Sequence, residues 1–447
     1  MEKTSINTIA GWVSGRLNIA GDIYIKKAVI DSRDAEEETL FFCLKGTKSD
    51  GHEYQEEVRS KGGCTIGERD DCDIVVKSSL EALSDIAREY RKTLDCIVVG
   101  ITGSNGKTTT TRLIRSVLGK AYKVHSSQKN FNNHIGLPLA LLGIDKSTEI
   151  AVLEMGANHT GEIASLSDIA GPCIGILTNI GDAHIGYFGG PRKILDAKFE
   201  LARSLPEGGT LIYNFDQPEI RDEAIKYGVK LNLLGFGKDP AADMTFQILQ
   251  FDHESTIFEV EGYTFKLNMP CIFNVYNALA AVATAKIFDI SFEDVDSAFR
   301  EMCALSHRLE TIEINGIKII DDSYNSSPAS LKTLFSELLK IYPQKDIIAV
   351  IGEMLELGEY SAKFHREAGR YIAGLDNVKC LIAGGSYAEK LIEGAIEGGL
   401  DGENTHLFST SSEAAGLIRR KADNNSLVVI KASRRQKLEK IIEDLKE

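Results

Sequence analysis

A glycine-rich loop followed by a lysine and threonines is the part of this sequence best suited to chemistry. Residues 100–109 read Gly-Ile-Thr-Gly-Ser-Asn-Gly-Lys-Thr-Thr. In such a loop the backbone N–H groups can surround a polyphosphate, Lys107 can reach the β- and γ-phosphate oxygens, and the Thr108 hydroxyl can bind Mg²⁺. The loop is therefore predicted to bind ATP. The residues predicted to bind it are Gly103, Ser104, Asn105, Gly106, Lys107, Thr108 and Thr109.

The residues on either side of the loop have the periodicities of a strand and a helix. An apolar run of β-formers at 96–99 precedes it, and apolar residues recur on one face of the helical pattern over 107–118. The spacing departs from the usual P-loop, because Ile101 stands where that pattern has its first glycine and Gly100 is one residue further out. A glycine-rich turn with an exposed lysine is the alternative, but the flanking strand and helix favour a phosphate loop.

Strands and helices alternate from this loop to about residue 305, which predicts a doubly wound parallel sheet. Apolar runs at 150–153, 174–177 and 210–213 read as further strands, and each is followed by a polar residue. Because ligands gather at the carboxyl ends of parallel strands, we expect these polar residues to face the loop. A third unit from about residue 310 has three more strand patterns of Rossmann-like order. It lacks a G-x-G-x-x-G motif, so no dinucleotide site is assigned.

Four polar clusters in the central region contain residue types that could hold a metal or a substrate. They cover residues 130–136, 154–157, 179–184 and 196–200. A carboxylate such as Glu154, directly after a strand, could hold Mg²⁺. Each cluster also has a structural interpretation. The glutamate could neighbour a helix N-cap, the histidine of the third cluster could be a satisfied structural residue, and the lysine of the fourth could be a solvated helix residue.

The N-terminal region carries polar loops at the ends of short strands. Polar groups on such loops could form a pocket for an anion or a nucleotide diphosphate. These loops can equally be interpreted as plain surface turns without a ligand. The polar residues concerned are Ser32, Arg33, Lys45, Asp50 and His52.

Length, charge and cysteine usage limit what the protein can be. A chain of 447 residues exceeds one ordinary core, and we predict three domains, at 1–93, 94–309 and 310–447. A net charge of −14 argues against binding to nucleic acid or anionic membranes. No apolar run reaches membrane-spanning length and no signal-peptide pattern begins the chain, so we expect a cytoplasmic protein without membrane insertion. The eight cysteines contain no C-x-x-C pair, which indicates reduced, mostly buried thiols rather than a disulfide framework or a zinc site.

Taken together, the motifs resemble those of the Mur ligase family, ATP-dependent enzymes that join a carboxylate to an amine. GITGSNGKTTT, KNFNNHIGLPLALL, EMGANHTGEI, TNIGDAHIGYFG and DAKFEL resemble the family's central domain, including the unusual glycine spacing. DSR, LKG and DGH resemble the UDP-binding domain of its later members. DDSYNSSP and IGEMLELG resemble the C-terminal domain of one member, which adds D-Ala-D-Ala to a UDP-N-acetylmuramoyl tripeptide in peptidoglycan precursor synthesis. The resemblance implies an α/β fold with a small UDP-binding domain, a central doubly wound P-loop ATPase domain and a C-terminal Rossmann-like domain.

The resemblance also implies a reaction and assigns residues to it. The substrate carboxylate attacks the γ-phosphate of ATP, and the amine of the second substrate then attacks the resulting acyl phosphate. Charge screening by Lys107 and by Mg²⁺ lets the two anions meet. The implied catalytic residues are Lys107, Glu154, His184 and Lys198, and the implied Mg²⁺ ligands are Thr108, Glu154, His184 and a carbamate on Lys198.

A carbamate is expected because a protonated Lys198 beside a metal ion would repel it, whereas a carbamate offers oxygen ligands. The alternative is a lysine that pairs directly with substrate phosphate. We expect a monomer whose partners are ATP, the UDP-linked muramoyl peptide and D-Ala-D-Ala. Further ATP contacts are implied for Asn274, Asn277, Arg308, Asp322 and Tyr324, the last three on domain closure. Acceptor contacts are implied for Ser32, Arg33, Lys45, Asp50, His52, Asn133 and Asn325.

Several motifs depart from the family's pattern. They touch the adenine contact, the hinge and the third domain, so the reaction type is better supported than the exact substrate. One alternative is a ligase of the same family acting on another acid and amine, such as a folylpolyglutamate-type enzyme, which the UDP-domain residues argue against. Another is a non-catalytic ATP-gated binding module. The departures are Cys271 and Phe273 before the adenine-side asparagines, His307 for a glycine at the hinge, Ser326-Ser327 for Ala-Asn, and Ala432 for a glycine.

Overall fold

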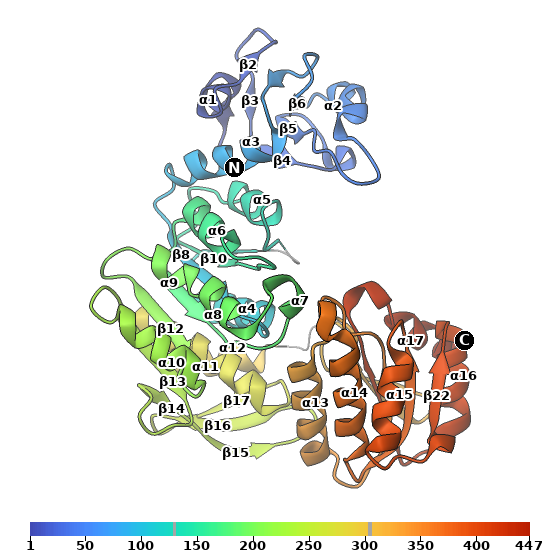
Figure 1. The fold of residues 1–447 in the computed structure, drawn as a ribbon. Coiled ribbons are helices and arrows are strands. Elements are labelled where there is room, and N and C mark those ends of the chain that lie inside the picture. Colours follow the sequence, from blue (N-terminus) through green and yellow to red (C-terminus); the bar gives the residue numbers. More distant parts are fainter. Residues whose placement is uncertain (128–130, 303–305) are drawn as a thin grey trace. The chain divides into compact units, whose positions relative to one another are not determined.

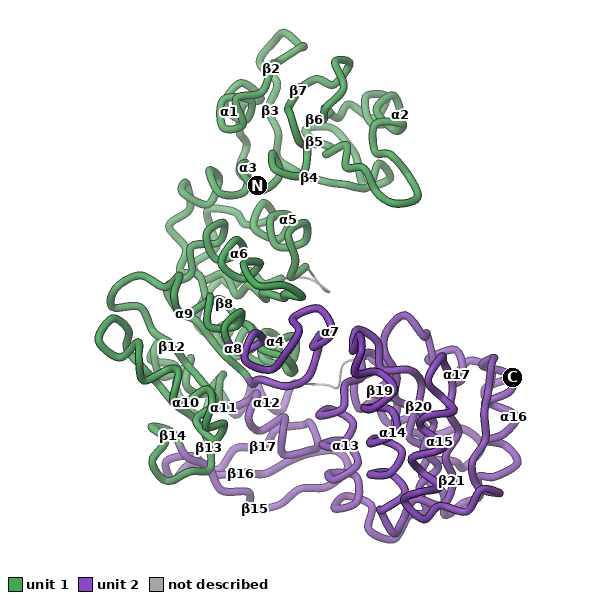
Figure 2. Tube along the Cα trace, viewed as in Figure 1, with its two compact units in different colours: residues 1–178, 196–244, 279–295 green, residues 179–195, 245–278, 296–447 purple. Residues whose placement is uncertain are grey.

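The computed structural model describes residues 1–127, 131–302 and 306–447 and divides into two compact units (Figure 2). The domain boundaries predicted from the sequence divide the chain differently and remain predictions. Unit 1 comprises residues 1–178, 196–244 and 279–295, and unit 2 comprises residues 179–195, 245–278 and 296–447.

The first sheet of unit 1 is small and mixed, with strand order β2-β7-β6-β5-β4 (Figure 1). β4 to β7 pair in parallel and β2 pairs antiparallel with β7. All four residues of β5 are buried, as expected for its apolar run. The strands are β2 (Arg16–Leu17), β4 (Lys27–Val29), β5 (Thr39–Phe42), β6 (Cys64–Gly67) and β7 (Ile74–Val75). The same region contains β1 (Thr4–Ser5), β3 (Tyr24–Ile25), α1 (Ile6–Trp12), the 3₁₀ turns η1 (Ser32–Asp34) and η2 (Gly51–Tyr54), α2 (Gln55–Ser60) and α3 (Ser79–Arg91).

The second sheet of unit 1 is the predicted doubly wound sheet, with strand order β14-β13-β12-β11-β8-β10-β9. The pairs from β9 to β13 are all parallel. Later strands lie on both sides of β8, so its carboxyl end is at a topological switch point, where ligands bind in such sheets. The strands are β8 (Ile97–Thr102), β9 (Val124–Ser126), β10 (Ile150–Glu154), β11 (Ile174–Leu177), β12 (Thr210–Asn214), β13 (Asn232–Gly237) and β14 (Met244–Thr245). The connecting helices are α4 (Lys107–Leu118), α5 (Gly136–Leu142), α6 (Glu162–Ala170), α8 (Pro191–Lys198), α9 (Glu200–Ser204), α10 (Pro218–Ala224) and the 3₁₀ turn η3 (Ile225–Tyr227).

The predicted alternation up to residue 305 is wrong beyond about residue 245. A three-stranded antiparallel sheet in unit 2 interrupts it, formed by β15 (Gln247–Phe251), β16 (Thr256–Val260) and β17 (Tyr263–Leu267). Glu261 and Gly262 join β16 to β17 with φ of +51° and +81°, the geometry of a tight two-residue hairpin. Helices α11 (Ile272–Ile287) and α12 (Phe292–Arg300) follow.

The six-stranded sheet of unit 2 confirms the Rossmann-like C-terminal region. Its order is β18-β19-β23-β20-β21-β22, parallel except for β18. β18 and β19 form a hairpin through Asn315-Gly316, at φ of +51° and +79°. The strands are β18 (Glu310–Ile314), β19 (Ile317–Asp322), β20 (Asp346–Ile351), β21 (Val378–Gly384), β22 (Thr405–Phe408) and β23 (Ser426–Lys431). Helices and 3₁₀ turns of unit 2 are α7 (Ile185–Phe188), α13 (Pro328–Ile341), η4 (Gly358–Tyr360), α14 (Ser361–Ala373), α15 (Ala388–Glu397), η5 (Gly402–Asn404), α16 (Ser411–Lys421), η6 (Arg434–Gln436) and α17 (Glu439–Lys446).

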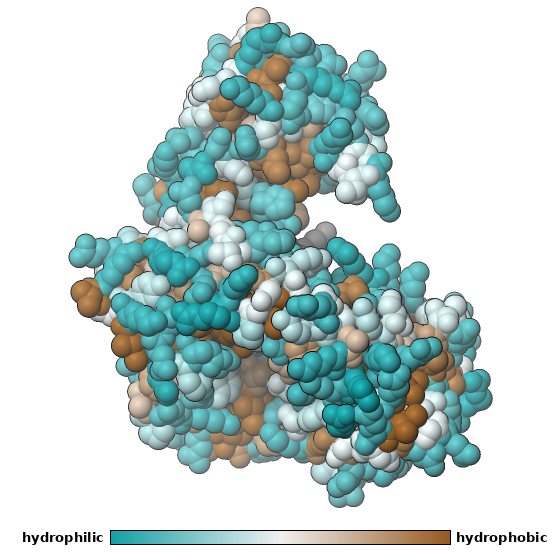
Figure 3. Space-filling view, in the orientation of Figure 1, coloured by the Kyte–Doolittle hydropathy of each residue, from teal (hydrophilic) through white to brown (hydrophobic). Residues whose placement is uncertain are grey.

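The character of the surface and the state of the cysteines match what the sequence predicts. Hydrophilic residues cover most of the face drawn in Figure 3, with hydrophobic residues in scattered groups. Over the described ranges, none of the helices has the length and apolar character needed to cross a membrane. The described cysteines are free thiols, and all of them except Cys173 are buried.

Candidate active site

The phosphate loop begins where β8 ends and closes on the first turn of α4. Gly103 and Gly106 have φ of +148° and +80°, a region that residues with a Cβ rarely adopt, and Gly106 is the N-cap of α4. The first N–H groups of α4 therefore open toward the loop, which is the arrangement that binds phosphate. Lys107 Nζ donates to the carbonyl oxygens of Gly103 at 2.8 Å and Ser104 at 3.2 Å. These bonds hold the lysine charge at the loop.

Neighbouring strands position this loop on both sides. Thr178, just after β11, donates its hydroxyl to the Asn105 carbonyl at 2.7 Å and its N–H to the Thr102 carbonyl at 3.0 Å. On the other side, the Thr102 hydroxyl donates to the Met155 carbonyl at 2.9 Å, just beyond β10. The loop is therefore tied to the two strands that flank β8.

Glu154 is the last residue of β10, in register with Ile101 of β8. Its side chain is buried, and Asn132 Nδ2 donates to Glu154 Oε1 at 2.8 Å. Asn132 is packed closely there, because a Cβ on Gly156 would lie 3.1 Å from its amide carbon. Carboxylate oxygens are the ligands that Mg²⁺ prefers, so Glu154 fits the predicted metal site.

The motif before α5 contributes a residue that the sequence did not single out. Asn132 is the side chain that reaches Glu154, whereas the predicted acceptor residue Asn133 is exposed and accepts the N–H groups of Ile135 at 3.1 Å and Gly136 at 2.8 Å. Asn133 thus bonds to two backbone N–H groups at the entrance to α5, whose N-cap is Ile135, and its contact with the acceptor remains a prediction. Asn130 of this motif lies outside the described residues.

Lys198 ends α8 and is only 2% exposed. Its Nζ donates to the Ala157 carbonyl at 3.4 Å. Burial, followed by the positive charge of Lys107, lowers the pKa of the Lys198 ammonium to about 7. A large share of this side chain is therefore a neutral amine near pH 7, and the interpretation as a solvated helix lysine is wrong.

Glu200 supports the segment that Lys198 contacts. Its carboxylate accepts the N–H groups of Gly161 at 2.6 Å and Ala164 at 3.0 Å, at the start of α6. Gly161 has φ of +93°, and a carboxylate at a helix N-terminus is electrostatically favourable. Residues 157–161 are thus held at both ends by the Asp-Ala-Lys-Phe-Glu motif.

His184 lies in unit 2, directly before α7, with φ of +62°. Its Nδ1 pairs with the Glu356 carboxylate, which lowers the pKa of that carboxyl group. The Gly186 N–H donates to the Glu356 carbonyl at 3.0 Å, and a Cβ on Gly186 would lie only 2.4 Å from Gly358 N. Only glycine permits this approach of the two loops. The roles of His184 in catalysis and metal binding remain predictions.

The two asparagines assigned to adenine lie one turn apart in α11 and are buried. Asn274 Nδ2 donates to the Pro270 carbonyl at 2.7 Å, and Asn277 Nδ2 donates to Asn274 Oδ1 at 3.4 Å. The side chains are therefore fixed relative to each other. Their contact with adenine remains a prediction.

Arg308, Asp322, Tyr324 and Asn325 come together in unit 2. The Arg308 guanidinium lies 4.0 Å from the centroid of the Tyr324 ring, a cation–π contact. Lys431, only 2% exposed, donates to Asp322 Oδ2 at 2.5 Å and to the Asn325 carbonyl at 3.0 Å. The strand end of β19 and the following turn are thus organised around a buried lysine.

The predicted acceptor residues of the N-terminal region divide into two groups. Arg33 is exposed in the 3₁₀ turn η1, and Lys45 is exposed on a loop where its backbone forms an isolated antiparallel β-bridge with Asp50. His52 is buried instead, and its Nδ1 donates to Asp50 Oδ1 at 2.6 Å. Ser32 is also buried, with its hydroxyl 2.9 Å from a carboxylate of α2. The side chains of Arg33 and Lys45 are accessible to a ligand, and the contacts of all five residues with the acceptor remain predictions.

Comparison with known proteins places the chain in a family. A model of the Mur ligase middle domain matches residues 101–285, and a model of the Mur ligase glutamate ligase domain matches residues 307–434. A Bacillus subtilis protein named UDP-N-acetylmuramoyl-tripeptide–D-alanyl-D-alanine ligase is 35% identical, with 100% of this chain and 99% of the relative covered. The chain belongs to the Mur ligase family. A Haemophilus influenzae protein of the same name is 31% identical over 100% of this chain and 99% of its own.

Solved Mur ligases share the fold of this one. MurF from Acinetobacter baumannii superposes with a TM-score of 0.88 at 29% identity, covering 100% of this chain and 99% of that chain. MurF ligase from Thermotoga maritima, in complex with ADP, gives a TM-score of 0.82 at 30% identity, covering 94% and 97%. The second of these Mur ligases therefore binds an adenine nucleotide.

Two positions where Mur ligases usually carry glycine hold larger residues here, and both keep a left-handed backbone. Cys271 has φ of +77° and His307 has φ of +62°. Such a conformation costs a residue with a Cβ about 1–2 kcal/mol. His307 gains a partner in exchange, because its Nδ1 lies 2.7 Å from Oδ2 of the fully buried Asp321.

A third such position, Ala432, lies opposite a glycine, and a Cβ on Gly352 would come within 2.7 Å of Ala432 Cβ. The motif at residues 431–434 also contains two basic residues, Lys431 and Arg434, for which the sequence analysis predicted no role. Lys431 is the buried lysine described above, and the Arg434 guanidinium lies 5.7 Å from the Tyr324 ring. No local sequence signal pairs Lys431 with Asp322, because β23 and β19 become neighbouring strands, with these two residues in register, only in the folded sheet.

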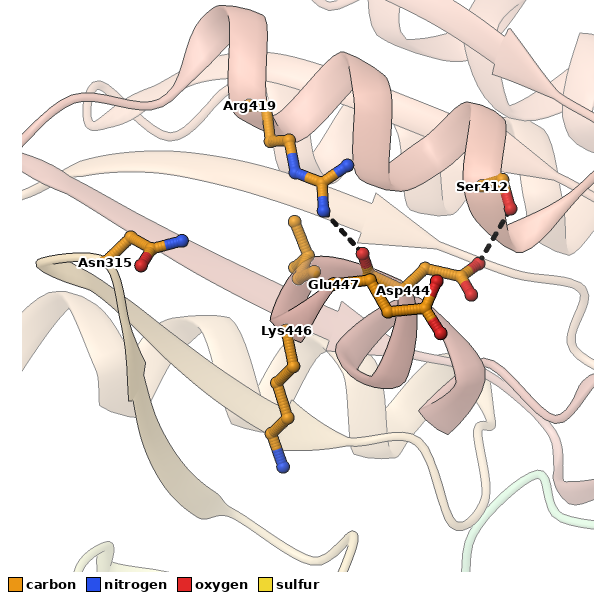
Figure 4. A pocket seen from close by; sticks show the side chains of 7 residues that line it. Asn315, Ser412, Arg419, Asp444, Lys446 and Glu447 are labelled. Carbon is orange, nitrogen blue, oxygen red and sulfur yellow. Dashed lines mark hydrogen bonds between the residues drawn. The ribbon is translucent and has the colours of Figure 1, made fainter.

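The pocket drawn in Figure 4 belongs to the C-terminal end of unit 2. Arg419 donates to the Asp444 carbonyl at 2.5 Å, and Ser412 donates to Asp444 Oδ2 at 3.1 Å. No predicted site residue lines it, and we assign it no role. The lining residues are Asn315, Ser412, Arg419, Asp444, Leu445, Lys446 and Glu447.

Proposed function

We propose that this protein uses ATP to join D-Ala-D-Ala to a UDP-N-acetylmuramoyl tripeptide in peptidoglycan precursor synthesis. The observation that carries the proposal is the match along the whole chain to relatives of that name. The geometry supports the reaction type, because a phosphate loop, a buried carboxylate and a buried lysine lie in one unit. ATP and a UDP-linked acceptor are cytoplasmic compounds, so the proposal places the protein in the cytoplasm. We also propose that the protein acts as a monomer.

In this reaction the acceptor carboxylate must approach the γ-phosphate although both are anionic. Lys107 and the N-terminal N–H groups of α4 supply positive charge at the phosphates. The carboxylate oxygen attacks the γ-phosphorus, the bond to the β-phosphate oxygen breaks, and ADP leaves. The amine then attacks the acyl carbon, loses a proton and expels phosphate. Water must be excluded during these steps, since it would hydrolyse the acyl phosphate.

The residues at the strand ends fit Mg²⁺. The Thr108 hydroxyl and the buried Glu154 carboxylate would hold one ion, and a modified Lys198 would offer oxygen ligands to a second. Mg²⁺ supplies charge neutralisation at the phosphate oxygens when it is bound. An unmodified Lys198 ammonium does not fit such a site, because it has no lone pair to donate.

We infer that Lys198 carries a carbamate in the working enzyme. Its nitrogen attacks CO₂, an N–C bond forms and a proton is released, so a neutral amine becomes an anion with two oxygen ligands. Burial and Lys107 lower the pKa of Lys198 to about 7, which makes the neutral amine available. The positive charge of Lys107 would then stabilise the carbamate, where it destabilises the ammonium.

Acetate rescue tests the carbamate. Lys198→Ala should be nearly inactive, and acetate should restore part of its rate by supplying a carboxylate in the vacated space. Lys198→Arg should not respond, because its guanidinium still fills the site with positive charge. Lys193→Ala, on the exposed side of the same helix, is the matched control and should keep its rate. A bare ammonium in high-resolution density, from crystals grown with bicarbonate and Mg²⁺, would refute the carbamate.

Phosphate release tests the function itself. The purified protein should release phosphate from ATP only when a UDP-N-acetylmuramoyl tripeptide and D-Ala-D-Ala are both present. Tripeptides with diaminopimelate or with lysine as the third residue should be compared, because they identify the acceptor. Release that requires a folate and glutamate would instead indicate a folylpolyglutamate-type enzyme. ATP binding without release under any of these conditions would indicate a binding module.

A further inference from the structure

Three potential metal ligands converge beneath the loop that follows β5. Cys43, His52 and Cys72 are all buried, and their ligand atoms lie within 4.8 Å of one another. The Cys43 thiol and the Cys72 sulfur share a hydrogen bond, which raises the pKa of Cys43 and lowers that of Cys72. Since the cysteines are 29 positions apart and form no C-x-x-C pair, the cluster exists only in the folded chain.

His52 is oriented as metal-binding histidines usually are. Its Nδ1 donates to Asp50 Oδ1 at 2.6 Å, and Asp50 Oδ2 accepts from Arg69 at 2.8 Å. A carboxylate on one ring nitrogen fixes the tautomer and leaves a lone pair on the other. In the structure the lone pair of Nε2 accepts the Glu68 N–H at 3.1 Å, and this is the nitrogen that could bind a metal ion.

Gly67 leaves the space into which these groups point. A Cβ on Gly67 would lie 2.5 Å from His52 Nε2, 2.9 Å from Cys72 Sγ and 2.9 Å from Cys43 Cβ. Any side chain at this position would fill the gap between the imidazole and the two cysteines. The absence of a side chain is thus a condition for the three ligands to approach a common point.

Glu68 lies beside this cluster on its solvent side, with a side chain that is 39% exposed. Its Oε2 lies 3.1 Å from His52 Nε2, while its Oε1 accepts the N–H of Ser79 at 2.6 Å and the Ser79 hydroxyl at 2.8 Å. With the imidazole proton on Nδ1, Nε2 and Oε2 are two electron-pair donors of the kind that a divalent cation binds. Tetrahedral zinc with Zn–N and Zn–O bonds of about 2.0 Å separates two such ligands by roughly 3.3 Å.

We propose that Cys43, His52, Glu68 and Cys72 form a structural site for a thiophilic divalent cation, with Zn²⁺ as the best fit. Two thiolates and an imidazole from buried residues, with the carboxylate of the exposed Glu68, suit Zn²⁺ in ligand type and number. Binding releases the two thiol protons, so that Zn²⁺ and two thiols give a bis-thiolate complex and two protons. It also replaces the bond at 3.1 Å that Nε2 accepts from the Glu68 N–H in the metal-free chain.

Such a site would close the loop that carries two of the predicted acceptor residues. Cys43 and His52 stand at the two ends of the segment that contains Lys45 and Asp50. Fixing both ends would hold this loop in one conformation and reduce the entropy lost on acceptor binding. This consequence rests on the proposed function, whereas the metal site does not.

Metal stoichiometry of the full-length protein tests the site without reference to activity. We expect the protein, loaded with Zn²⁺ and dialysed, to retain about one Zn²⁺ per chain, and its melting temperature to fall when a strong chelator removes the metal. Cys43→Ser and Cys72→Ser should each weaken Zn²⁺ affinity by more than about a hundredfold. Losing a residue that only hydrogen-bonds to a metal ligand lowers metal affinity by about 10- to 100-fold, and losing the ligand itself should lower it further. Cys64→Ser, at another buried cysteine of the same sheet, should bind Zn²⁺ as the parent does.

Two further measurements keep the test decisive if a serine variant fails to fold. Co²⁺ added to the wild-type protein should give the intense thiolate-to-metal absorption of a cysteine-ligated site. Bound Zn²⁺ should also slow the labelling of two thiols compared with chelated protein. The proposal is overturned if the wild type retains no stoichiometric Zn²⁺, if the Cys43 and Cys72 variants retain as much as Cys64→Ser, or if mass analysis finds a Cys43–Cys72 disulfide. An unchanged metal site with no ligase activity would count against the proposed function alone.

Discussion

Lys107 and Lys198 show how position sets the chemistry of one residue type. Lys107 opens α4 and donates to two carbonyl oxygens of its own loop, which suits a permanent positive charge. Lys198 is buried and contacts the Ala157 carbonyl. Burial and the positive charge of Lys107 both disfavour the protonated form of Lys198 and so lower its pKa. One lysine can therefore serve as a cation and the other as a nucleophile for CO₂.

Lys107→Ala should abolish ligation and leave the fold intact. The lysine contributes charge at the transferring phosphate and is only partly buried, so its loss costs the transition state about 3 kcal/mol or more, on the order of a hundredfold or greater in rate. Initial rates of the purified variant test the loss of ligation, and circular dichroism tests whether the fold is intact. Lys123→Ala, an exposed lysine after α4, is the control. A turnover rate of Lys107→Ala close to that of the wild type would refute the assignment of residues 100–109 as the phosphate loop.

Activation by CO₂ should depend on pH through Lys198. Its folded pKa of about 7 is lowered from the ordinary value of 10.5, so the neutral amine predominates above about pH 7 and falls roughly tenfold per pH unit below it. Enzyme depleted of CO₂ should therefore regain more activity at pH 8 than at pH 6, measured at equal dissolved CO₂ and after equal incubation. A larger recovery at pH 6 would contradict the carbamate or the direction of the pKa shift.

At the scale of elements, tight turns connect the strands that carry the site. The hairpin of β18 and β19 places Asp321 and Asp322 at the end of a buried strand. His307, in the segment before β18, reaches back to Asp321, and its carbonyl accepts the Tyr324 N–H at 3.0 Å. These two bonds hold the segment around His307 against the end of β19, next to the contact between Arg308 and Tyr324.

His307→Gly should destabilise the protein although glycine suits the backbone there. It relieves a left-handed conformation worth about 1–2 kcal/mol, but it adds chain entropy to the unfolded state and leaves the buried Asp321 without its imidazole partner, at about 1–3 kcal/mol. We expect a net loss of about 1–2 kcal/mol in urea unfolding. His307→Asn should lose less, because asparagine tolerates this conformation and its amide can donate to the carboxylate. Stabilisation by glycine would mean that strain outweighs the Asp321 bond.

At the scale of the whole molecule, the predicted acceptor residues of the N-terminal region and the phosphate loop belong to different sheets. Arg33 and Lys45 lie on exposed loops of the five-stranded sheet, and the phosphate loop belongs to the seven-stranded sheet. Changes in the first sheet should therefore alter acceptor binding without altering the contacts made by ATP.

Arg33→Ala should weaken acceptor use and spare ATP binding. The guanidinium is exposed and pairs with Asp31 beside the Ser32 turn, so its removal deletes a cation without disturbing a core. Calorimetry with ATP and with the UDP-linked acceptor separates the two affinities. Arg16→Ala, at another exposed arginine of this sheet that also pairs with an aspartate, should leave both unchanged. Equal loss of ATP and acceptor affinity in Arg33→Ala would indicate a structural role instead.

The sequence by itself determined the features that are encoded in contiguous residues. The phosphate loop, the strands β10, β11 and β12 with polar residues at their ends, and the α/β class all follow from local periodicity and from glycines at left-handed positions. The hairpin of β18 and β19 also has a local sequence signal, since Asn315-Gly316 is a strong turn former. The family resemblance rested on the same contiguous motifs.

Only the tertiary structure decided which side chains meet. Asn132 rather than Asn133 contacts Glu154, Lys198 is buried, and Lys431 joins Asp322, because each contact links segments that are distant along the chain. Burial and neighbouring charge set the pKa of Lys198, and neither can be read from its helix. The cluster of Cys43, His52 and Cys72 has the same origin, since strand order brings three loops around Gly67 and no local spacing encodes that order.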